Sequence, residues 1–229
     1  MACRKAFATV FLLAAVSANA FAAELQSVEQ RLSYIVGTQM GQQMKAQGIP
    51  FDKDAFVMAI EDAMAGKPPR MTHEEIQQTL VAYQQQRQAE EAAAAESNQK
   101  ASEAFLASNS KKPGVKVTPS GLQYQVLKEG QGDSPSATDT VVVNYRGTLL
   151  DGTEFDSSYK RGEPATFPVN NVIKGWQEAL QMMKPGAKWK IFVPADLAYG
   201  ERGAGAAIGP NATLTFEVEL LEVKAPAAK

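Results

Sequence analysis

The sequence contains no glycine and no proline between residues 70 and 112, although the whole chain has 17 glycines and 12 prolines. Because these residues are the strongest helix breakers, one helix of about 38 residues can run through this stretch and reach about 57 Å. Thr72 and Glu75 have the spacing of a capping box at its start. Beyond Tyr83 the residues are mostly Gln, Ala, Glu and Arg, which favour helix but leave little to bury. Residues 71–112 are therefore predicted to form a solvated connecting helix, with a disordered linker as the alternative.

Two shorter helical patterns occupy residues 24–70. Apolar residues recur three and four apart in the first, and Asp52 can cap the second. Two short helices cannot bury a methionine-bearing face alone, and methionine is common at adaptable surfaces. We therefore expect residues 24–66 to join two copies of the chain as a homodimer. Packing of the same face against Phe56 and Met64 within one chain is the alternative.

The hydrophobic period changes after Pro113 from helical to alternating. Apolar and polar residues alternate around residues 122–126, 141–145, 189–193 and 214–220, which is typical of antiparallel strands with one buried face. Val172, Trp176 and Leu180 lie four apart and predict a short helix that starts near Asn170 and Asn171. The predicted fold class is α+β: a helical N-terminal dimerisation module, a long connecting helix, and a C-terminal curved antiparallel β-sheet wrapped around one short helix.

The N-terminus has the order of a secretory signal peptide. Arg4 and Lys5 precede an apolar run, and small residues follow up to Ala20 and Ala22. The apolar run of about 11 residues is too short to span a bilayer, so residues 1–22 are predicted to be removed on export. The exported protein is expected in the periplasm, at the outer membrane or outside the cell.

Composition excludes several classes of function. The 23 Lys and Arg nearly balance the 25 Asp and Glu, so no basic footprint for nucleic acid is present. His73 is the only histidine and Cys3 the only cysteine. A His/Cys metal cluster or a Ser–His or Cys–His catalytic pair is therefore poorly supplied, and we expect neither a metal nor a cofactor.

Six short motifs in the C-terminal half point to one family. They are Val143-Asn144-Tyr145-Arg146-Gly147, Asp151 to Ser158, Val172 to Trp176, Met183 to Gly186, Pro194 through Ala198-Tyr199-Gly200, and Asn211 to Leu214. In this order and spacing, residues 118–224 resemble the FKBP-type peptidyl-prolyl cis-trans isomerases. The helical half looks like the secreted macrophage-infectivity-potentiator (Mip) subgroup. The implied organisation is a signal peptide (1–22), a dimerisation module (24–70), a connecting helix (71–112) and an isomerase domain (113–229).

The resemblance implies an enzyme that accelerates rotation about X–Pro bonds and assists the folding of exported proteins, with chaperone activity. Its partners would be unfolded or loop segments that contain X–Pro, and macrolide inhibitors. A proline-binding module or chaperone whose turnover is incidental is the alternative. The family's catalytic positions fall on Asp156, Tyr199, Tyr145 and Phe155. Its substrate-binding positions fall on Phe167, Val172, Ile173, Trp176, Ile208 and Phe216.

The resemblance also suggests individual roles. Trp176 would form the floor under the proline ring, the Ile173 N–H and the Tyr199 hydroxyl would hold a carbonyl, and Asp156 would either steady the pocket or polarise the amide. Ala165 and Ala204 depart from relatives that carry an aromatic residue and a histidine at these positions, which affects the pocket rim rather than its floor. Without the resemblance, Trp176 at helical spacing would be ordinary core.

Overall fold

The computed structural model describes residues 25–225, which divide into two compact units, one ending at Gln43 and the other beginning at Met44. The predicted signal peptide lies outside the described residues. In the described part of the chain, no helix is long and apolar enough to cross a membrane.

Two shorter helices precede the long one. They are α1, Val28–Gln47, and α2, Lys53–Met64. The side chain of Asp52 accepts the backbone N–H of Ala55 at 2.9 Å, so the predicted cap of α2 is confirmed. At the other end Gly66 has φ of 65°, a left-handed conformation that glycine adopts without steric cost.

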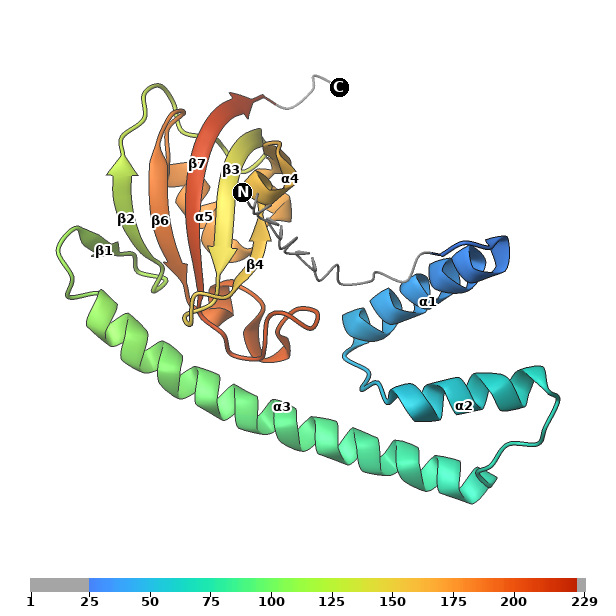
Figure 1. Ribbon diagram of the computed structural model, residues 1–229. Coiled ribbons are helices and arrows are strands. Elements are labelled where there is room, and N and C mark those ends of the chain that lie inside the picture. Colours follow the sequence, from blue (N-terminus) through green and yellow to red (C-terminus); the bar gives the residue numbers. More distant parts are fainter. Residues whose placement is uncertain (1–24, 226–229) are drawn as a thin grey trace, which may run out of the picture. The chain divides into compact units, whose positions relative to one another are not determined.

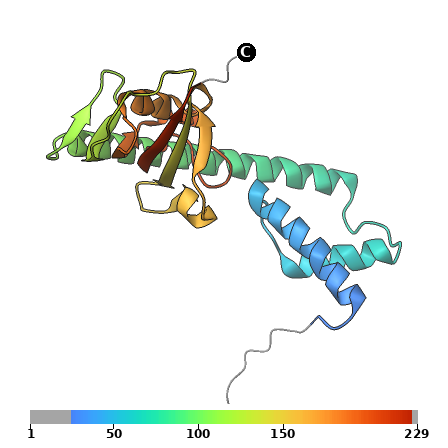
Figure 2. The ribbon, with the colours of Figure 1, turned by 90° about the horizontal axis from the view of Figure 1, so that it is seen from above.

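The connecting segment is one continuous helix, α3, His73–Asn109 (Figure 2). The Thr72 hydroxyl accepts the Glu75 N–H at 3.2 Å, and the Glu75 carboxylate accepts the Thr72 N–H at 2.7 Å. The predicted capping box is therefore present, and the prediction of a helix rather than a disordered linker is confirmed. Most of α3 is exposed, but Ser102 and Asn109 near its end are buried.

The C-terminal half forms one antiparallel sheet (Figure 1). Its main path runs β1-β2-β6-β7-β3-β4, and β5 pairs with β3. The strands are β1, Val115–Val117; β2, Gln123–Lys128; β3, Thr140–Thr148; β4, Glu154–Ser157; β5, Ala165–Pro168; β6, Lys188–Val193; and β7, Leu214–Lys224. Alternate residues of β3 and β7 are buried, as the period of two predicts.

Short helical segments connect these strands. They are α4, Ser158–Arg161; α5, Lys174–Met182; and three 3-10 turns at Val169–Asn171, Ala195–Leu197 and Gly200–Arg202. Trp176, Ala179 and Leu180 of α5 are buried against the sheet in one core cluster. A Cβ on Gly175 would lie 2.5 Å from a methyl carbon of Val193, so this glycine lets α5 approach β6 closely. The α+β prediction is thus confirmed, with α5 as the short helix that the sheet covers.

The start of α5 differs from the prediction. The helix begins at Lys174, and Ile173 is its N-cap residue. Asn170 and Asn171 lie in the preceding 3-10 turn, and Val172 is extended between the two segments. Val172 is therefore no part of the helical face formed by Trp176 and Leu180, although it lies four residues before Trp176.

Candidate functional site

A concavity of about 310 Å³ opens beside α5. It is lined by one side chain from α5 and by residues of β3, β4, β5 and β7. Residues of the segment between β5 and α5 and of the loop between β6 and β7 complete the lining. Nine of the ten predicted site residues lie on its wall: Tyr145, Phe155, Asp156, Phe167, Val172, Ile173, Trp176, Tyr199 and Phe216. Residues from four of the six motifs, together with Phe167 and Phe216, therefore converge on one hollow, although they are spread over more than seventy residues.

Trp176 is held by three aromatic side chains. Its ring makes edge-to-face contacts with Tyr145 at 5.2 Å, Phe216 at 5.3 Å and Phe167 at 6.0 Å between centroids. The side chain is only 4% exposed, yet it lines the open concavity. Such edge-to-face packing fixes ring orientation, so the indole offers a rigid apolar surface to a ligand.

A glycine in β3 makes room for the aromatic walls. A Cβ added to Gly147 would lie 2.6 Å from a ring carbon of Phe155 and 2.9 Å from one of Phe216. These two rings meet edge to face with centroids 5.5 Å apart. Because carbon atoms normally approach to about 3.5–4.0 Å, the arrangement of these walls requires glycine at this position.

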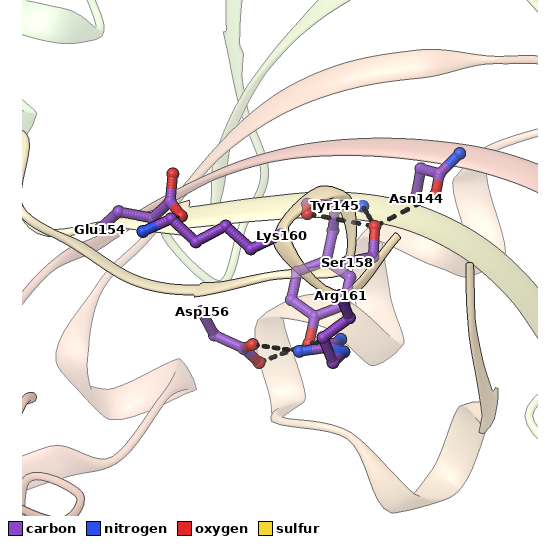
Figure 3. A network of polar contacts seen from close by, with 7 residues as sticks. All are labelled: Asn144, Tyr145, Glu154, Asp156, Ser158, Lys160 and Arg161. Carbon is purple, nitrogen blue, oxygen red and sulfur yellow. Dashed lines mark hydrogen bonds and ion pairs between the residues drawn. The ribbon is translucent and has the colours of Figure 1, made fainter. Parts of the chain in front are cut away.

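A hydrogen-bonded network borders the aromatic surface (Figure 3). The Tyr145 hydroxyl donates to one carboxylate oxygen of Asp156, and the Arg161 guanidinium pairs with the other. Arg161 also donates to the Tyr145 hydroxyl oxygen at 2.9 Å and lies over the tyrosine ring, 5.4 Å from its centroid. The three side chains hold one another, and both oxygens of Asp156 already have donors.

This network shifts the pKa values of its members. Burial acts to raise the pKa of Asp156, but hydrogen bonds from Tyr145 and Arg161 outweigh it and hold that pKa below its ordinary value. Burial, together with the hydrogen bond to Asp156, raises the pKa of Tyr145. At neutral pH the site therefore contains an ionised carboxylate beside a neutral phenol.

A second group of polar contacts fixes the backbone behind this network. The buried Ser158 hydroxyl accepts the Tyr145 N–H at 2.9 Å and donates to the amide oxygen of Asn144 at 3.1 Å. Glu154 forms ion pairs with Arg146 and Lys160, both at 2.9 Å. Figure 3 shows Asn144, Ser158, Glu154 and Lys160 around Tyr145 and Asp156. They tie α4 and β4 to β3, so the carboxylate of Asp156 rests on a rigid support.

Two donors lie at the rim. The backbone N–H of Ile173 belongs to the N-cap of α5, and among the described residues no acceptor takes a hydrogen bond from it. Unpaired N–H groups at a helix start are suited to hold a carbonyl oxygen. Tyr199 also lines the concavity and is 42% exposed. A ligand whose apolar ring lies on Trp176 would thus have these two hydrogen-bond donors beside its neighbouring polar groups.

One predicted residue lies elsewhere. Ile208 is 7% exposed, belongs to the core cluster and does not line the concavity. It forms a β-bridge with Ala204, so its backbone closes the tip of a loop and its side chain is buried. Ala165 also packs against the core and, like Ala204, is not on the wall.

Sequence reasoning missed two residues of the site. Asn171 lines the concavity from the 3-10 turn before Val172. Arg161 binds both Asp156 and Tyr145, and the signal was available, because a basic residue stands five positions after the candidate aspartate.

Comparison with known proteins agrees with this geometry. Residues 29–126 match the domain amino terminal to FKBP-type peptidyl-prolyl isomerase, and residues 132–221 match FKBP-type peptidyl-prolyl cis-trans isomerase itself. The chain is 49% identical to peptidyl-prolyl cis-trans isomerase Mip of Coxiella burnetii, over 95% of this chain and 96% of the relative. It is 46% identical to the outer membrane protein MIP of Legionella longbeachae, over 89% of each.

A solved structure shows the same fold. The crystal structure of FkpA from Escherichia coli matches with a TM-score of 0.62 and 41% identity, over 90% of this chain and all of that one. Both domains and nearly the full length are thus shared with the Coxiella relative, whose name carries the isomerase activity. The chain belongs to the FKBP-type peptidyl-prolyl cis-trans isomerases and is an enzyme of that class.

Proposed function

We propose that the X–Pro bond is rotated in the concavity over Trp176. The proline ring lies on the indole, with Tyr145, Phe155 and Phe216 as walls. The observation that carries this proposal is that nine residues, assigned one by one from the family resemblance, line one hollow of about 310 Å³. The floor is apolar and rigid, which suits a ring that must stay in place while the preceding bond turns.

The mechanism needs no covalent intermediate. The barrier of about 18–20 kcal/mol exists because amide resonance gives the C–N bond partial double-bond character. Water stabilises the charge-separated planar amide, so an aromatic hollow that excludes water favours the less polar twisted form. The Ile173 N–H and the Tyr199 hydroxyl, both at the rim, then hold the substrate carbonyl while the bond turns.

Asp156 acts as a positioning residue in this proposal. One carboxylate oxygen of Asp156 binds Tyr145 and the other binds Arg161, so both oxygens already have partners within the protein. The ionised carboxylate fixes the Tyr145 ring, which contacts Trp176 at 5.2 Å. Of the two roles expected from sequence, steadying the pocket fits these contacts better than polarising the amide.

A coupled assay tests the site directly. A protease that cleaves only the trans form of a short X–Pro peptide reports the rate of isomerisation. We expect Tyr199→Phe to lower kcat/KM by about threefold to tenfold, since one hydrogen bond to the substrate is lost. We expect Asp156→Ala to lower it further, while Tyr159→Phe, an exposed tyrosine outside the wall, serves as the control.

Each alternative has its own outcome in this assay. Wild-type rates for both Tyr199→Phe and Asp156→Ala would place the reaction elsewhere. Binding of the X–Pro peptide without acceleration by the wild-type chain would favour the proline-binding module. A macrolide inhibitor should compete with the peptide, since the same hollow would hold both.

Residues 24–66 are proposed to join two chains. No residue of α1 is buried in the single chain, and Val28, Leu32 and Ile35 are each more than half exposed. An apolar helical face open to water is favourable only when a partner covers it. Two linked sites would then bind one unfolded client with avidity, which supports a chaperone role.

Light scattering during size-exclusion chromatography measures the mass of the full chain without its leader. We expect a dimer for the wild type and a monomer for Ile35→Glu. A monomer mass for the wild type would refute dimerisation through this module.

Export is proposed from the leader pattern of residues 1–22 and from a relative named as an outer membrane protein. Clients would then be exported proteins that contain X–Pro in unfolded or loop segments. Cell fractionation tests this location, since recovery of the uncleaved chain in the cytoplasm would contradict it.

A further inference from the structure

The loop between β6 and β7 brings Tyr199 to the concavity and closes on itself. At its base the N–H of Asn211 donates to the carbonyl oxygen of Gly200 at 2.9 Å. Near its tip Ala204 and Ile208 exchange two backbone hydrogen bonds, at 2.8 and 3.1 Å. Because Gly200 follows Tyr199 directly, this hydrogen bond links the position of Asn211 to that of Tyr199.

The C-terminal part of α3 holds the returning arm of this loop. The Ser102 hydroxyl donates to the carbonyl oxygen of Asn211 at 3.1 Å and accepts the N–H of Thr213 at 3.2 Å. One turn earlier, the side-chain amide of Asn98 donates to the carbonyl oxygen of Pro210 at 2.8 Å. Ser102 is 8% exposed, so its hydroxyl has exchanged water for these two backbone groups.

The backbone of the loop is strained where the helix holds it. Asn211 has φ of 55° and is the one non-glycine residue with positive φ in the described part of the chain. Such a conformation persists where its surroundings determine it, and both backbone polar groups of Asn211 are bonded, one to Gly200 and one to Ser102. The helix and loop also approach closely, since a Cβ on Gly209 would lie 3.1 Å from the amide nitrogen of Asn98.

We propose that Ser102 and Asn98 of the connecting helix are positioning residues for isomerisation. They fix residues 210–213 and, through the hydrogen bond between Asn211 and Gly200, they hold Tyr199 at the rim. This inference rests on the proposed role of Tyr199. It also means that the catalytic unit begins within α3 rather than at residue 113.

Ser102→Ala is the principal test. Alanine is the best helix former, so this change leaves α3 intrinsically more stable while it removes both contacts to the loop. We expect kcat/KM on a short X–Pro peptide to fall by about threefold to tenfold. Ser97→Ala, an exposed serine on the same helix, is the matched control, and Ser102→Thr should restore activity because it keeps the hydroxyl.

A double-mutant cycle with Tyr199→Phe separates positioning from a general structural effect. If Ser102 acts through Tyr199, Ser102→Ala should lower kcat/KM by a much smaller factor in the Tyr199→Phe background than in the wild type. Losses that simply multiply would overturn the proposal, as would kcat/KM of Ser102→Ala within twofold of the Ser97→Ala control. A wild-type rate for Tyr199→Phe would also overturn this proposal, because Ser102 would then have no catalytic group to position, whereas the proposed site over Trp176 would still be judged from Asp156→Ala.

Amide resonances provide a readout that does not depend on activity. In the full chain, Ser102→Ala should shift the amide signals of Gly200 and Asn211, whereas Ser97→Ala should leave them in place. Unchanged signals in Ser102→Ala would show that the loop keeps its position without the helix and would overturn the proposal.

Discussion

Gly147→Ala tests whether the aromatic walls of the site are as closely packed as the structure shows. The new methyl carbon would lie 2.6 and 2.7 Å from two ring carbons of Phe155 and 2.9 Å from one of Phe216. Since carbon contacts normally lie at about 3.5–4.0 Å, one or both rings must move by about 1 Å. The rings cannot relax independently, because they pack edge to face with centroids 5.5 Å apart.

Two magnitudes follow from this displacement. Overpacking of this kind costs about 1–3 kcal/mol in the free energy of unfolding. A displacement of about 1 Å in groups that position the substrate costs up to about a hundredfold in rate, so kcat/KM should fall by about tenfold to a hundredfold. The activity loss should therefore exceed the loss expected from unfolding, because a protein that is a few kcal/mol stable remains folded in the assay.

Urea denaturation and the protease-coupled assay measure these two effects separately. Gly147→Ala with Phe155→Leu is the informative companion, since the smaller side chain should restore part of the stability without restoring the wall. A Gly147→Ala enzyme with wild-type stability and wild-type kcat/KM would refute the view that the methyl group displaces the wall rings.

Three further predictions concern the polar contacts. Tyr145→Phe removes the hydroxyl between Asp156 and Arg161 and should lower the free energy of unfolding by about 1 kcal/mol in urea denaturation, with kcat/KM also reduced; unchanged values would show that the network contributes nothing. Because the folded-state pKa of Asp156 lies below its ordinary value, its stabilising effect is present at neutral pH and is lost as the pH falls below about 4. The stability difference between the wild type and Asp156→Asn should therefore shrink on acidification, and a difference that grows would contradict this sign. Thr72→Ala removes the hydroxyl that caps α3 and should lower the free energy of unfolding by about 1 kcal/mol, measured by circular dichroism during urea denaturation; Thr79→Ala, in the second turn of α3, is the control.

The helical elements were largely predictable because their signals are local. The capping box at Thr72 and the cap at Asp52 depend on residues three apart, and both form as expected. The start of α5 was misplaced because Val172 matches a helical spacing by residue type alone, while its extended backbone is set by the preceding 3-10 turn. Periodicity does not distinguish a residue on a helix from one that lies just before it.

Contacts between distant segments were not predictable in the same way. Ser102 and Asn109 are polar residues in a helix whose composition indicates a solvated surface, and their burial depends on backbone groups more than a hundred residues away or on Gln123. A polar residue at such a position gives no local sign that it is buried, because polar side chains are usually exposed. Ile208 shows the converse, since the resemblance assigns it to substrate binding but the fold turns its side chain into the core.

Trp176 shows why a site of this kind is recognised from family motifs rather than from hydrophobic periodicity. The residue is at once part of the core cluster and the floor of the concavity, and its 4% exposed surface is what a bound ring would cover. The same edge-to-face contacts with Tyr145 and Phe216 contribute to stability and orient the walls. A substitution at Trp176 would therefore lower stability and activity together and could not assign a role. Substitutions at the margin, such as Tyr199→Phe at the rim and Ser102→Ala on α3, leave the core intact, so a loss of activity in them reports on the position of the catalytic groups.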